Sequence, residues 1–148
     1  METFTAAVET SAIKTIVQKQ RDYFNSGATK SVKFRKEQLT LLKNLVSTHE
    51  ADFIEALKKD LRKHEFEAYA TEIGFVHIEL KKAISNVEKW AKPRTVPTPL
   101  FHFNGSSFVQ PEPYGVTLLI SPWNYPFQLL FAPLVGAMAA GNTAVLKP

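Results

Sequence analysis

Lys147 is the residue best placed to do chemistry, because it is the single cation that follows an uncharged stretch from Gly115 to Leu146. It comes directly after a short apolar run that predicts a buried strand. Open α/β sheets bind their ligands in a crevice at the carboxyl ends of the strands. The position therefore favours ligand binding, and the alternative is a lysine that merely begins a solvated loop.

Other reactive side chains are absent or unfavourably spaced. The chain has no cysteine, which excludes a thiol nucleophile, a cysteine-ligated zinc and a redox pair within these residues. The four histidines lack metal-ligand spacing, and Glu72 and His77 fall on different helical faces, so we expect no metal site. A net charge of +4 is too small to indicate a nucleic-acid partner. Three basic pairs alternate with acidic residues, which is typical of solvated helix faces: Lys58-Lys59, Arg62-Lys63 and Lys81-Lys82.

The elements that must position Lys147 belong to a chain whose two parts differ in composition. All nine prolines occur at Pro93 or later, whereas the first 92 residues carry apolar side chains at helical spacing. This pattern predicts four helices, of which the first ends at Asn25-Ser26-Gly27. A capping-box pair, Ser47 and Glu50, predicts a break after Val46 and a new helix start near His49.

The segment from Lys92 to Pro113 predicts a protruding β-arm. Its prolines exclude a helix and fit edge strands, which need not donate every ladder hydrogen bond. The Asn104-Gly105 pair is a strong hairpin-turn signal.

The last part of the chain predicts a βαβ unit. Val116–Ile120 is typical of a strand buried on both faces, and Ser121-Pro122 ends it. The segment 127–140 is long enough for a crossover helix, which Pro133 should kink or divide, and Thr143 to Leu146 forms a second strand.

Several of these segments resemble the aldehyde dehydrogenase superfamily. The match is strongest in 111–127, which contains Pro-Trp-Asn-Tyr-Pro-Phe, and in 133–148, which ends Gly-Asn-Thr-Ala-Val-Leu-Lys-Pro. The Ser26-Gly27 helix end and the stretch from Asp60 to Tyr69 resemble the class-three branch of fatty and aromatic aldehyde dehydrogenases. The similarity runs from about Val17 to the end of the chain.

The resemblance implies NAD(P)-dependent oxidation of an aldehyde to a carboxylic acid through a cysteine thioester. Asn124 matches the family's oxyanion-hole asparagine, whose neutral amide can stabilise a negative oxygen without a proton transfer. The local alternative is that Asn124 caps the following helix or holds an Asx-turn. Lys147 matches the lysine that hydrogen-bonds the adenosine ribose of the cofactor.

The resemblance also implies roles for the neighbours of Asn124. Tyr125 matches an aromatic position that lines the substrate tunnel. From the residues alone, Trp123 and Tyr125 are equally well explained as packing rings. Four residues match positions that wall the cofactor cleft near the nicotinamide: Ile120, Ser121, Pro122 and Trp123.

The implied fold class is α/β, an incomplete Rossmann-like doubly wound domain. Residues 1–92 form the helical part of the cofactor-binding domain, 93–113 the oligomerisation arm, and 114–148 the first βαβ unit of the dinucleotide-binding domain. Because a two-stranded sheet is marginal alone and the chain stops just after a buried strand, we expect a missing C-terminal portion. The family's nucleophilic cysteine and general-base glutamate have no counterpart up to Pro148, so the 148-residue chain alone is expected to be inactive.

The full-length protein is then expected to use NAD or NADP, to take a small-molecule aldehyde and to form a homodimer through the arm. No secretory leader or membrane segment is recognisable in these residues, which favours a cytoplasmic location. Two alternatives stay open. One is a non-catalytic helical interaction module that retains an enzyme-derived tail, and the other is an acylating or phosphate-reducing relative.

Overall fold

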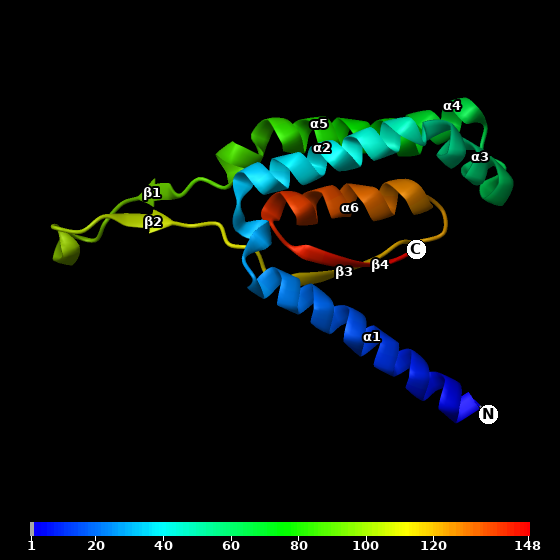
Figure 1. Ribbon diagram of the computed structural model, residues 1–148. Helices are drawn as coiled ribbons and strands as arrows, with labels where there is room; N and C mark the ends of the chain where they lie inside the picture. The colour runs from blue at the N-terminus through cyan, green and yellow to red at the C-terminus, as the bar shows by residue number, and fades with distance from the viewer. Residues whose placement is uncertain (1) are drawn as a thin grey trace.

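The computed structural model describes the backbone of residues 2–148 and the side chains of residues 12–148. Helices of the N-terminal half precede a β-arm and a βαβ unit (Figure 1). The helices are α1 (Glu2–Asn25), α2 (Val32–Thr48), α3 (Glu50–Leu61), α4 (Glu65–Ala68), α5 (Gly74–Trp90) and α6 (Pro126–Ala140), with 3-10 turns η1 (Ala28–Lys30) and η3 (Leu100–His102) and a π turn η2 (Tyr69–Ile73). The strands are β1 (Arg94–Val96), β2 (Ser107–Val109), β3 (Val116–Ile120) and β4 (Thr143–Lys147).

The core lies between α2, α5 and α6. Apolar residues at helical spacing on α2 and α5 meet the apolar face of α6, and this burial drives the three helices together. Figure 1 shows α2 and α5 side by side above α6, which in turn covers one face of the β3–β4 sheet. The completely buried apolar side chains include Leu39, Val46, Ile73, Val76, Leu80 and Val87.

The helix boundaries confirm part of the sequence prediction. α1 ends at Asn25, and Gly27 takes a φ of 77°, a left-handed conformation that glycine adopts readily. The predicted helix start near His49 is also present, although α2 runs to Thr48, past the break predicted after Val46. The predicted capping box is wrong, because His49 is the N-cap of α3 and no side chain caps it; its Nδ1 lies 2.9 Å from Asp52 Oδ2 instead. The prediction of four helices is wrong as well, because the short α4 and the π turn η2 precede α5.

The β-arm projects away from the rest of the molecule (Figure 1). β1 and β2 pair antiparallel, with Arg94 opposite Val109 and Val96 opposite Ser107. The predicted tight turn is wrong, because the strands are joined by the longer connection 97–106. Proline at 97 has no N–H with which to extend the ladder, and the connection contains the helical turn η3, which the sequence prediction had excluded.

The predicted βαβ unit is confirmed. β3 and β4 pair in parallel from Val116 opposite Thr143 to Ile120 opposite Lys147, and α6 is the crossover. Pro133 does not divide α6, which is a single helix with that exposed proline inside it. The lysine at 147 belongs to the strand itself rather than to the following loop.

β3 is not buried on both faces, contrary to the sequence prediction. Leu118 and Ile120 are each 62% exposed. α6 covers one face of the sheet, whereas α1 contacts the sheet and then diverges from it toward the N-terminus (Figure 1). Within residues 2–148, no helix combines the length and the apolar character needed to cross a membrane.

Candidate functional site

The turn 121–125 joins β3 to α6 at the carboxyl ends of the two parallel strands. The N–H of Ser121 donates to the carbonyl of Lys147 at 3.0 Å, which extends the β3–β4 ladder by one bond. The hydroxyl of Ser121 donates to the carbonyl of Pro126 at 2.8 Å. The half-buried Ser121 therefore ties the turn to the sheet and to the first residue of α6.

Ile120 and Lys147 lie side by side at this edge because they are partners in the parallel register. Both are exposed, so the ammonium group of Lys147 is available to a ligand at the carboxyl ends of the strands. This is the place where open parallel sheets bind ligands.

The middle of the turn points its side chains outward. Pro122, Trp123 and Asn124 are all exposed, and the Trp123 side chain at 83% exposure takes no part in the core. The N-cap of α6 is Tyr125, and no side chain of the turn caps it. The amide of Asn124 does not cap α6 and makes no hydrogen bond to residues 12–148, so its N–H groups are free to donate to a ligand.

A buried ion pair lies beneath the turn. Glu72 is completely buried in the π turn η2 and pairs with Lys63, which is 8% exposed and follows α3. The other carboxylate oxygen of Glu72 accepts hydrogen bonds from the N–H groups of Phe127 (2.8 Å) and Gln128 (3.2 Å). Because the first N–H groups of a helix lack partners within it, Glu72 caps α6 from another element.

Lys63 holds the turn itself. Its ammonium group donates to the backbone carbonyl of Asn124 at 3.1 Å and lies 3.9 Å from the centre of the Tyr125 ring. Tyr125 is half-buried, and this cation–π contact occupies one face of its ring. The prediction that Lys63 belongs to a solvated face is wrong, although the lysines at 58, 59, 81 and 82 are exposed as expected.

This ion pair was not predicted as part of the site. A usable signal was present: Glu72 lies four residues before Val76 and eight before Leu80, in line with their buried stripe. A carboxylate in an apolar stripe needs a partner, because an unpaired buried charge is very costly. Nothing in the local sequence around Lys63 identifies that partner.

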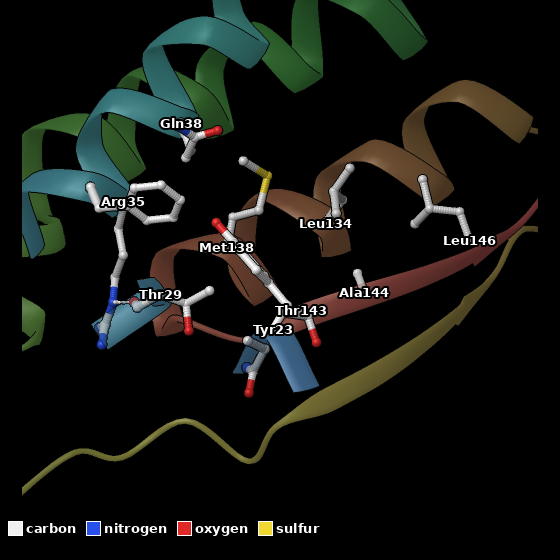
Figure 2. Close-up of a pocket in the computed structure, with 11 residues that line it drawn as sticks. Tyr23, Thr29, Arg35, Gln38, Leu134, Met138, Thr143, Ala144 and Leu146 are labelled. Carbon is white, nitrogen blue, oxygen red and sulfur yellow. Dashed lines mark hydrogen bonds between the residues drawn. The ribbon is translucent and has the colours of Figure 1, made fainter. Parts of the chain in front are cut away.

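A cavity of about 240 Å³ lies elsewhere, bounded by α2, α6 and β4 (Figure 2). None of the predicted site residues lines it. Figure 2 shows Met138 and Leu134 facing Ala144 across it, and the guanidinium of Arg35 turned to the carbonyl of Thr29. The lining of the cavity is mainly apolar, and its one charged side chain, Arg35, is engaged in backbone contacts. We therefore do not place the candidate site there.

Comparison with known proteins gives a consistent result. The family model described as "Aldehyde dehydrogenase family" matches residues 3–148. The 4,4'-diaponeurosporen-aldehyde dehydrogenase of Staphylococcus aureus is 50% identical over 85% of this chain, and the dimeric NADP-preferring aldehyde dehydrogenase of Canis lupus familiaris is 40% identical over 93%. Further relatives carry the name aldehyde dehydrogenase family 3.

A solved structure, the substrate-bound state of Staphylococcus aureus AldH, superposes with a TM-score of 0.90 at 47% identity over 92% of this chain. The chain spans only 28% and 30% of the length of the two relatives and 30% of that structure. The turn 121–125 and the edge of β4 therefore belong to the N-terminal part of a larger fold.

Proposed function

The chain belongs to the aldehyde dehydrogenase family, and we propose that it is the N-terminal part of an enzyme that oxidises aliphatic or aromatic aldehydes to carboxylic acids with NAD or NADP. The observation that carries this proposal is the free, exposed amide of Asn124 on an anchored turn at the ligand-binding edge of a parallel sheet. The cysteine and glutamate that the family's reaction needs are not expected within these residues, so the activity is that of the longer protein.

Asn124 is the proposed catalytic residue of this part of the chain. When a nucleophile attacks the aldehyde, negative charge develops on the carbonyl oxygen, and a preorganised N–H donor stabilises it. The amide of Asn124 suits this task because it keeps no other hydrogen bond to residues 12–148. It also remains neutral and does not form an imine with the substrate, as a lysine would.

The edge of the sheet is the proposed cofactor site. Lys147 presents an exposed ammonium group with three donors, which fits the hydroxyl groups of a ribose. Four further residues line the same edge and are proposed to wall the cleft: Ile120, Ser121, Pro122 and Trp123. A nicotinamide cofactor held by these residues would supply the hydride acceptor for the oxidation.

The proposed substrate contact is Tyr125. Lys63 covers one face of its ring, which leaves the other parts of this half-buried side chain for an apolar aldehyde. The name of the Staphylococcus aureus relative also specifies an aldehyde as its substrate.

The β-arm is the proposed oligomerisation element of a homodimer. Leu100, Phe101 and Phe103 are 88%, 96% and 79% exposed, an apolar surface that a second subunit would cover. The relative from Canis lupus familiaris is named as dimeric. We further propose a cytoplasmic location for this protein.

The test is an assay of the whole reading frame that contains these residues. The purified protein is weighed by intact-mass spectrometry and mixed with NAD or NADP and a medium-chain or an aromatic aldehyde, and cofactor reduction is followed by absorbance. We expect reduction with either aldehyde. A protein that reduces neither cofactor but binds a protein partner without cofactor dependence contradicts the proposal.

A further inference from the structure

We propose that Lys63 and Glu72 form a positioning pair that fixes the backbone on both sides of Asn124 and so aims its amide at the reacting oxygen. The inference rests on the proposed function, because it takes Asn124 as the oxyanion donor. It assigns a role to two side chains that are buried beneath the turn.

The pair brackets the turn at two points. Lys63 binds the carbonyl of Asn124, and Glu72 binds the N–H groups of Phe127 and Gln128 at the start of α6. The peptide group that follows Asn124 and the first turn of the helix are therefore held by one connected unit.

The side chain of Asn124 depends on this support. It makes no hydrogen bond to residues 12–148, so the backbone of the turn sets where the side chain starts and which positions its amide can reach. The opposite end of the turn is fixed independently by the bond between Ser121 N–H and the carbonyl of Lys147. Loss of the pair would release the Asn124 end of the turn while the Ser121 end stays in place.

The charged groups of both side chains already have partners. Glu72 uses both carboxylate oxygens, and Lys63 uses its charge on Glu72, on the Asn124 carbonyl and on the Tyr125 ring. A buried ion pair is weak support for stability alone, because apolar residues of similar volume fill such a site as well or better. The pair is best explained by what it orders, which is the turn.

The π turn η2 explains how the carboxylate reaches that turn. Glu72 and Ile73 are neighbours in sequence, yet both are completely buried. Ile73 belongs to the apolar core, whereas Glu72 contacts the N-terminus of α6. Insertions of this kind in helices are frequent at functional sites.

The test compares matched pairs of substitutions in the full reading frame. The principal variant is the double substitution Lys63→Met with Glu72→Gln, which leaves no lone charge buried. The control is Lys36→Met with Glu88→Gln, because that pair joins α2 to α5 at 2.7 Å but is exposed at both ends. Turnover is expressed per cofactor-binding site, so that unfolded protein lowers the number of sites and not kcat.

A misplacement of about 1 Å can lower a rate by about 100-fold, so we expect a fall in kcat of about 10- to 100-fold for the principal variant. The Kd for the cofactor should stay within about twofold, since the bond from Ser121 to Lys147 is retained. The control pair should keep the kcat of the wild type.

The decisive comparison repeats the principal variant in an Asn124→Ala background. If the pair acts through Asn124, its loss changes kcat less than about twofold there, because coupled residues are not additive. Wild-type kcat in the principal variant, or a full multiplicative loss in the Asn124→Ala background, overturns the inference. Wild-type kcat for Asn124→Ala alone overturns the role proposed for Asn124 instead.

Discussion

The guanidinium of Arg35 lies directly against Gly141, so closely that a Cβ atom at Gly141 would come within 2.6 Å of its Nε. Arg35 is held there by carbonyl groups of Thr29 (2.8 Å), Lys30 (3.0 Å) and Ala139 (3.5 Å). Burial lowers the pKa of the Arg35 side chain. The contact joins the N-terminal helices to the corner between α6 and β4, and so positions the strand that ends at the candidate cofactor site.

The substitution Gly141→Ala should therefore destabilise the protein. Gly141 has a φ of 91°, where a side chain is strained, and Arg35 can move aside only by giving up its carbonyl contacts. We expect a loss of about 2 kcal/mol or more in the free energy of unfolding, measured by denaturant titration of the full reading frame.

The matched control for that substitution is Gly136→Ala, because a Cβ there would meet no described atom within 4 Å apart from its chain neighbours and the nearby backbone of its own helix. It replaces glycine inside α6 and should gain about 0.5–1 kcal/mol. Equal effects of the two substitutions would show that the contact with Arg35 is unimportant.

The substitution Lys147→Ala should weaken cofactor binding. The exposed ammonium group at the end of β4 is the proposed donor to the ribose, and a hydrogen bond to a charged group supplies about 1.5–3 kcal/mol, or about tenfold or more in Kd. Calorimetric titration with the cofactor measures this change. Lys58→Ala, at an exposed position on α3, should leave the Kd unchanged. An effect confined to the KM for the aldehyde would count against the assignment.

Deletion of residues 97–109 should weaken assembly before it affects cofactor contacts. The deletion removes the exposed apolar side chains of the arm together with β2, and none of the proposed cofactor-binding residues. Sedimentation analysis should show a monomer whose Kd for the cofactor is that of the intact protein. Phe101→Ser alone should weaken the dimer in the same direction, and a deletion variant that stays dimeric would disprove the role of the arm.

Local patterns were sufficient to predict the elements that carry the site. The apolar run Val116–Ile120, the crossover helix and the second strand all form, because each is encoded by its own composition and periodicity. The path of the arm and the cap of α3 were predicted wrongly, since short turn and capping signals compete with the packing of neighbouring residues.

Local patterns point to only one part of the support of the site, the Glu72 carboxylate in an apolar stripe, and not to its contacts. Lys63 contacts the Asn124 carbonyl across 61 positions of sequence, and Glu72 contacts the Phe127 N–H across 55. A lysine or a glutamate considered alone is expected to be exposed to solvent. The packing of α5 against α6 brings these two charges to the N-terminus of α6, which has no side-chain cap of its own. Lys147 was identified as a candidate from its place at the end of a predicted strand, whereas the role of Asn124 came from the resemblance.

The most direct measurement is the kcat of the Asn124→Ala variant of the full reading frame, beside the wild type and Asn86→Ala. The side-chain amide of Asn86 on α5 donates to the carbonyl of Lys82 at 2.8 Å, and this residue serves as the matched asparagine. We expect kcat to fall by about 100-fold or more for Asn124→Ala, with cofactor binding preserved, and to stay at the wild-type value for Asn86→Ala. Wild-type kcat for Asn124→Ala would contradict the assignment of the 121–125 turn as the oxyanion site.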